Sequence, residues 1–175
     1  ALLDPAVLIV SFFKNWRALS IVGMTGTLIV FSSWFDNFYT KDQLVSTMFF
    51  LTVFFLIYSI SSFIYNIVNK EKSTGAEQIM TLLSAFIYFA VSYNLLKPEH
   101  DGVLGFFALL MAIYYFIWAY AVKAATPEDD RLYNFLAFLS IGFITLAVPL
   151  QFDKFVITII WIIEGVLISL VGVRM

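Results

Sequence analysis

The chain contains a series of long, uninterrupted apolar stretches, each followed by a short polar loop. Six of them come close to the roughly 20 residues that an α-helix needs to cross a bilayer. They are residues 18–38, 44–68, 75–96, 103–122, 132–148 and 155–173. Because their apolar residues lack the alternation of a membrane β-strand, the pattern predicts spanning helices rather than a barrel.

Composition indicates that lipid is the solvent of these stretches. Of the 175 residues, 62% are apolar and 13% are charged, whereas a soluble domain is nearer half apolar and a quarter charged. The net charge of -2 gives no sign of a nucleic-acid partner. We therefore predict an all-α, polytopic transmembrane helix bundle that forms a single domain over residues 1–175, with the lipid bilayer as its partner.

A shorter apolar run occupies residues 1–13. It is too short for a full span, and it lacks the basic leader of a signal peptide. We expect a partial N-terminal helix in a chain that is part of a longer protein, with other helices of that protein or membrane partners beside it. A short re-entrant or interfacial helix is the alternative.

Helix-start signals coincide with the breaks between these stretches. In the three loops at residues 40–43, 74–77 and 126–129, a Thr lies three residues before an acid or amide, which is the spacing of a capping box. Asp101 and Asp153 are suited to cap the stretches that follow them.

Basic residues are distributed unevenly between alternate loops. One set consists of Lys14, Arg17, Lys70, Lys72, Lys123, Arg131 and Arg174, and the other of Lys41, Lys97 and Lys154. Because Lys and Arg are enriched in cytoplasmic loops, we predict that the first set faces the cytoplasm and that the protein is integral to the cytoplasmic (inner) membrane.

Glu164 lies in the middle of the apolar stretch 155–173. An ionised carboxylate at the bilayer centre costs about 3 kcal/mol or more, so this side chain is expected to be protonated or to face a polar interior. One interpretation is a proton relay, an ion site or a contact for a cationic group. The other is a buried acid that hydrogen-bonds neighbouring hydroxyls and holds helices together.

Polar side chains also recur at three- and four-residue spacing in the second half of the stretch 44–68 and at the residue after it, which places them on one face of a helix. They are Tyr58, Ser61, Ser62, Tyr65, Asn66 and Asn69. Such a face turns away from lipid, either to line a wet cavity or to supply hydrogen bonds between helices. Tyr58, Ser62, Tyr65 and Asn66 are therefore, with Glu164, the candidate intramembrane polar residues.

Small residues at similar spacing predict close contacts between helices. Gly105, Ala108, Ala112 and Ala119 share one such face, and Gly23 and Gly26 lie close together in an earlier stretch.

Catalytic chemistry is poorly represented. The chain has no Cys and His100 is its single His, so neither a thiolate site nor a multi-histidine metal site is available. We predict no catalytic residue, no metal site, no cofactor and no enzymatic activity.

Two segments resemble a known bacterial family. One reads Val148-Pro149-Leu150-Gln151-Phe152-Asp153, followed by Thr158, Trp161 and Glu164-Gly165, and the other runs from Asn15-Trp16-Arg17 to Gly23-x-x-Gly26-Thr27. Both are similar to the domain of unknown function numbered 2339, whose members are multi-pass predicted membrane proteins. The resemblance implies a polytopic membrane protein in a bacterial envelope, usually much longer than this chain, and it implies no catalytic residue.

Three functions are compatible with these features. The first is a non-enzymatic envelope or membrane component, such as a scaffold. The second is a transporter or lipid-translocating segment, with Glu164 and the polar face at residues 58–69 lining the path. A membrane enzyme is the third and is the least supported.

Overall fold

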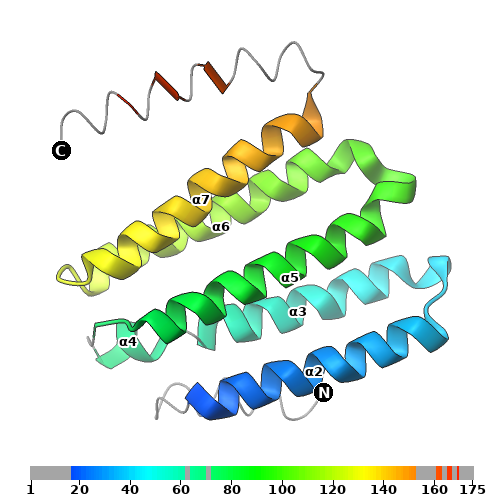
Figure 1. Cartoon of the computed structure of the whole chain (residues 1–175), viewed down its shortest axis with the longest axis horizontal. Helices are drawn as coiled ribbons and strands as arrows, with labels where there is room; N and C mark the ends of the chain where they lie inside the picture. The colour runs from blue at the N-terminus through cyan, green and yellow to red at the C-terminus, as the bar shows by residue number, and fades with distance from the viewer. Residues whose placement is uncertain are drawn as a thin grey trace.

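The computed structural model describes residues 17–61, 64–69 and 72–152, together with the isolated positions 161–162, 165–166 and 169. Within these residues all regular secondary structure is helical. The helices run up and down side by side (Figure 1). In chain order they are α2 (Arg17–Phe38), the 3-10 turn η1 (Lys41–Gln43), α3 (Leu44–Ser61), α4 (Ile64–Asn69), α5 (Gly75–His100), the 3-10 turn η2 (Asp101–Val103), α6 (Leu104–Ala125) and α7 (Asp130–Gln151).

Four described segments are long and apolar enough to cross a membrane, namely Lys41–Ser61, Gly75–Pro98, Asp101–Ala125 and Asp130–Gln151. They correspond to four of the six predicted spans. α2 forms a 22-residue helix at the predicted 18–38 stretch but is not one of these four. The predicted partial helix at 1–13 and most of the stretch 155–173 lie outside the described residues. The described part therefore supports four of the six full spans.

Two described helices cover the predicted stretch 44–68, namely α3 up to Ser61 and α4 from Ile64 to Asn69. Residues 62 and 63 between them lie outside the described residues. α5 and α6 extend beyond their predicted ends, to His100 and Ala125.

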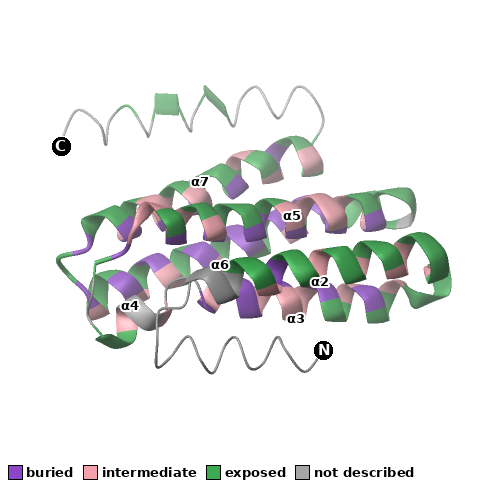
Figure 2. Ribbon diagram, turned by 60° about the horizontal axis from the view of Figure 1, so that its bottom comes forward, coloured by how far each residue is buried: buried purple, intermediate pink, exposed green. Residues whose placement is uncertain are grey.

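Large apolar side chains cover the outside of the bundle. In the most apolar 18-residue part of each of the four segments, only 28–39% of the residues are buried. Phe86, Phe138 and Tyr120 are each at least 70% exposed. Figure 2 shows exposed residues along α2, α5 and α7. Since soluble proteins rarely expose apolar patches of this extent, lipid is the solvent that suits this surface.

Five threonine hydroxyls on the helices are satisfied locally, as a lipid environment favours. The side chains of Thr25, Thr47, Thr52, Thr81 and Thr145 each donate to the carbonyl four residues earlier, at 2.7–3.0 Å. Such bonds keep these five donors from facing hydrocarbon without a partner. They also allow polar residues in these helices without any functional role.

The tightest packing lies between α6 and α7, which share the most extensive contact in the described chain. The predicted seam of small residues on α6 is confirmed, because Ala108, Ala112 and Ala119 are at most 2% exposed. At one end of the seam, a Cβ added to Gly105 would lie 2.5 Å from the Cβ of Gln151. Gly26 on α2 differs, because nothing lies within 4 Å of an added Cβ.

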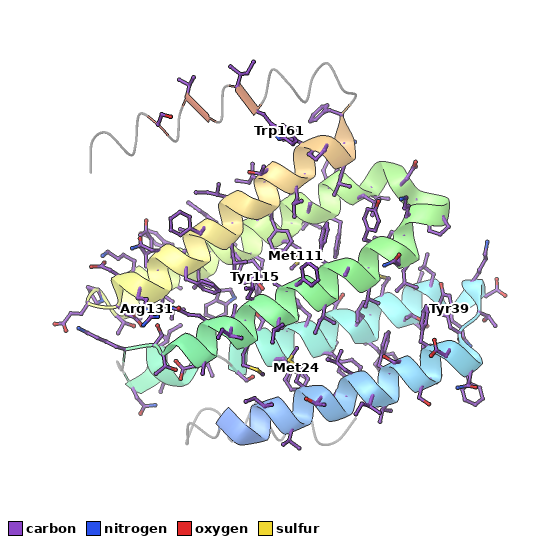
Figure 3. The ribbon with its side chains drawn as sticks, viewed as in Figure 1. Met24, Tyr39, Met111, Tyr115, Arg131 and Trp161 are labelled. Atoms are coloured by element: carbon purple, nitrogen blue, oxygen red, sulfur yellow. The ribbon has the colours of Figure 1, made fainter. Side chains whose placement is uncertain are left out.

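The α6–α7 contact carries one buried polar link. The Ser140 hydroxyl donates to the carbonyl of Ala112 at 2.9 Å. Tyr115, which is fully buried, stacks on Phe143 of α7 at 5.9 Å between ring centroids. Figure 3 shows Tyr115 and Met111 pointing into the interior of the bundle. These contacts make α6 and α7 the most extensively packed pair of helices in the described chain.

Asp129 ties two loops together at one end of the bundle. One carboxylate oxygen accepts from the backbone N–H of Leu132 at 3.1 Å and caps α7, and the other accepts from the N–H of Ser73 at 2.6 Å. Asp129 is only 3% exposed. The capping box expected at residues 126–129 is therefore wrong in its register, because α7 starts later and Asp129 itself is the cap.

The other predicted caps have mixed outcomes. The Glu77 carboxylate accepts from the N–H of Thr74 at 2.7 Å, as the capping box of α5 requires. The Thr40 side chain makes no cap hydrogen bond. The Thr40 carbonyl accepts from the N–H of Gln43, at the start of the 3-10 turn η1. Asp101 lies inside η2 and does not cap α6, and Asp153 lies outside the described residues.

The alternating helices place the described basic residues as the loop assignment requires. Arg17, Lys72, Lys123 and Arg131 lie at the end where α5 and α7 begin, and Lys41 and Lys97 lie at the opposite end. Figure 3 shows Arg131 and Tyr39 at these two ends.

Candidate functional site

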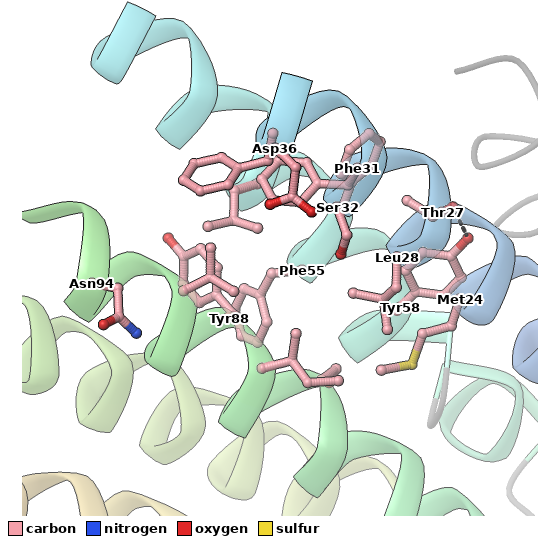
Figure 4. Close-up of a pocket in the computed structure, with 16 residues that line it drawn as sticks. Met24, Thr27, Leu28, Phe31, Ser32, Asp36, Phe55, Tyr58, Tyr88 and Asn94 are labelled. Atoms are coloured by element: carbon pink, nitrogen blue, oxygen red, sulfur yellow. Dashed lines mark hydrogen bonds between the residues drawn. The ribbon is translucent and has the colours of Figure 1, made fainter. Parts of the chain in front are cut away.

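A cavity of about 390 Å³ lies between α2, α3 and α5 (Figure 4). α2 supplies Met24, Thr27, Leu28, Phe31, Ser32, Phe35 and Asp36, α3 supplies Leu51, Phe54, Phe55 and Tyr58, and α5 supplies Ser84, Ile87, Tyr88, Val91 and Asn94. Its volume falls in the range of ordinary small-molecule sites. The cavity exists because α2 contacts α3 much less extensively than α3 contacts α5.

Aromatic rings and aliphatic side chains form the walls. Phe55 of α3 stacks on Tyr88 of α5, with ring centroids 4.4 Å apart and planes 9° from parallel. The Tyr88 hydroxyl is already engaged by the hydroxyl of Thr52 at 2.8 Å. The wall therefore presents mostly ring faces and CH groups, which suit an apolar occupant.

Tyr58 lies at the inner end of the cavity. It is 4% exposed, and its hydroxyl is 2.9 Å from that of Thr27 on α2. This bond is drawn in Figure 4 and joins α2 to α3. Tyr58 is thus the predicted site residue that the described structure places at a cavity.

Three exposed polar residues lie towards the other end. Ser32, Asp36 and Asn94 line the cavity and are all exposed, so the cavity opens to the surface there. Asp36 is in the last turn of α2, and Asn94 is one turn before Pro98 near the end of α5. These helix ends lie at the same end of the bundle.

Hydrogen bonding leaves this mouth rich in acceptors. The Asn94 side-chain NH₂ donates to the carbonyl of Ala90 at 2.8 Å, which leaves the amide oxygen as its other polar atom. Pro98 has no N–H, so it offers no helical donor to the Asn94 carbonyl four residues earlier. Asp36 adds a carboxylate.

The cavity has the length of one leaflet. From Met24 at its inner end to Asp36 at its mouth, α2 rises about 18 Å at 1.5 Å per residue. Half of a typical hydrocarbon core is about 15 Å. One end of the cavity therefore lies near the midplane and the other near a headgroup layer.

The remaining predicted site residues are not located by the structure. Tyr65 and Asn66 belong to α4, but the placement of their side chains is not described. Ser62 and Glu164 lie outside the described residues. Within the described chain, no three His, Asp or Glu side chains gather closely enough to hold a metal ion.

Sequence reasoning missed Asp36 and Asn94. The signal was present for Asp36, because it is one of few acids inside a predicted span. Its position near the end of that span made it look like an ordinary boundary residue.

Comparisons with known proteins gave one match. A family model described as "Predicted membrane protein (DUF2339)" matches residues 1–175. No curated protein matches, and no solved structure matches.

Proposed function

The chain belongs to the DUF2339 family of predicted membrane proteins, and we propose that it is a non-enzymatic membrane component that holds the hydrocarbon chain of a lipid between α2, α3 and α5. The proposal rests on the cavity described above. Its location in the inner membrane, with the Lys72 and Arg131 end in the cytoplasm, is part of this proposal.

Three properties of the cavity support a lipid chain as its occupant. Its walls are mainly aromatic and aliphatic, its length is about one leaflet, and Asp36, the charged residue among those that line it, lies at one end. An amphipathic molecule aligned with the bilayer has the same distribution. A soluble polar metabolite would instead need polar partners distributed along the wall.

Blocking the cavity provides the test. Ser32 and Ser33 are adjacent exposed residues on α2, but only Ser32 lines the cavity. In the full chain, the S32W indole should fill part of the cavity, whereas the S33W indole points elsewhere. Lipids retained after gentle detergent purification are counted by native mass spectrometry.

We expect the wild type and S33W to retain a lipid and S32W to lose it. Equal retention in all three, or retention in none, contradicts the proposal. A segment of protein seated in the cavity would produce the second result.

A second candidate function is lipid translocation, with Glu164 and the polar residues around Tyr58 lining the path. The position of Tyr58 at the inner end of the cavity favours it. E164Q should then slow the exchange of a fluorescent lipid between leaflets of proteoliposomes containing the full chain, without altering lipid retention. An unchanged exchange rate contradicts translocation through Glu164.

A further inference from the structure

We infer that the lipid held in this cavity carries a primary ammonium headgroup, as in phosphatidylethanolamine. This inference rests on the proposed function and adds the class of headgroup. It follows from the groups that the mouth of the cavity presents.

Charge is the first argument. Among the described residues that line the cavity, Asp36 is the only one with a charged side chain. Its position in the last turn of α2 puts the carboxylate at the level where the headgroup of a lipid aligned with the cavity would lie. A carboxylate there attracts a cationic headgroup and repels one whose only charge is a phosphate.

Hydrogen-bonding capacity is the second argument. One of the two N–H donors of the Asn94 side-chain amide is used on the carbonyl of Ala90, and the backbone carbonyl of Asn94 has no helical donor in Pro98. The carboxylate of Asp36 and the two oxygens of Asn94 therefore give the mouth three kinds of acceptor, beside the second amide N–H of Asn94 and the hydroxyl of Ser32 as donors. A primary ammonium has three N–H donors, whereas a trimethylated ammonium of the same charge has none.

Alternative headgroups fit less well. A phosphatidylglycerol headgroup offers hydroxyl donors but brings a net negative charge towards Asp36. A choline headgroup brings a positive charge but no donor for Asn94. Of these three headgroups, ethanolamine alone supplies both the positive charge and the N–H donors.

The experiment uses the full chain in nanodiscs made of equal parts phosphatidylethanolamine, phosphatidylcholine and phosphatidylglycerol of the same acyl chains. After release into the gas phase, the lipids that remain bound are identified by native mass spectrometry. We expect about a fivefold preference for the ethanolamine lipid over the choline lipid, which is the upper end for an exposed ion pair.

Variants locate this preference. D36N should remove it, and D36E should retain it. D42N is the matched control, because Asp42 is an exposed acid in η1 that does not line the cavity, and it should behave as the wild type.

Two results would overturn the inference. One is equal retention of the three lipids by the wild type, and the other is an ethanolamine preference that D36N leaves intact. If S32W still abolishes retention in either case, the lipid-binding function stands and only the headgroup assignment fails. If the wild type retains no lipid, both fail.

Discussion

Removing the carboxylate of Asp129 should separate the start of α7 from the loop before α5. In D129A, the N–H of Leu132 loses its cap, which costs about 1 kcal/mol. The buried N–H of Ser73 loses an acceptor that lies 2.6 Å away, and an unsatisfied buried donor costs about 1–3 kcal/mol. The expected loss of unfolding free energy is therefore about 3 kcal/mol.

Substitution by Asn divides this loss into its two parts. Asn caps helices about as well as Asp, so D129N keeps an oxygen for Leu132 but turns an NH₂ group towards the N–H of Ser73. We expect a loss of about 2 kcal/mol, from the Ser73 bond alone. E128A is the control, since Glu128 is exposed in the same turn and its loss should cost no more than about 0.5 kcal/mol.

The assay is unfolding of the full chain in mixed micelles with increasing dodecyl sulfate, followed by tryptophan fluorescence. The order of stability should be wild type, then D129N, then D129A, with E128A close to the wild type. If D129A and E128A unfold at the same detergent fraction, Asp129 does not brace the two loops. If D129N is as unstable as D129A, the Leu132 cap contributes nothing.

Three further predictions concern packing, the attachment of α2 and topology. G105A should lose about 1–3 kcal/mol in the same unfolding assay because its Cβ meets α7. G142A, with nothing within 4 Å of its Cβ, should keep the wild-type stability or gain up to about 1 kcal/mol from the higher helix propensity of Ala. Equal stabilities of the two variants would contradict the close packing at Gly105. Y58F removes a hydrogen bond between α2 and α3, and such a bond is worth about 0.6 kcal/mol in membrane proteins. Backbone amides of α2 should therefore exchange hydrogen about threefold faster in Y58F than in the wild type. An equal increase in the exchange rate of α7 amides would contradict a local link between α2 and α3. Because the chain has no Cys, a single Cys introduced as K72C or H100C can be labelled specifically. In intact cells, a membrane-impermeant maleimide should label the H100C variant and leave the K72C variant unlabelled. Labelling of the K72C variant alone would reverse the proposed orientation.

Much of the fold could be predicted from the sequence because the bilayer leaves few alternatives to a helix. Long apolar runs gave α5, α6 and α7 close to their observed positions, and the spacing of Gly105, Ala108 and Ala112 identified the seam correctly. Boundaries were less certain, because more than one residue in a loop can serve as a cap. At residues 126–129, both Thr126 and Asp129 have a suitable side chain, and only the bond from Ser73, 56 residues away in sequence, selects Asp129.

The candidate site was harder to predict. Tyr58 was selected because it belongs to a polar face, but its position at a cavity depends on how far α2 lies from α3. That distance is a tertiary property without local periodicity. Asp36 and Asn94 belong to different helices, and nothing in their separate surroundings indicates that they line one opening.

The unequal contacts within the bundle have a consequence for the order in which it assembles. α6 and α7 are neighbours in sequence and share the most extensive packing in the described chain, so this hairpin can form early, at little cost in loop closure. α2, by contrast, has only a small contact with another long helix, α3, whereas α3, α5, α6 and α7 each share more extensive contacts within the described chain. We expect α2 to join last, which means that a lipid already lying beside α3 and α5 can be enclosed during biogenesis, without having to enter a finished protein.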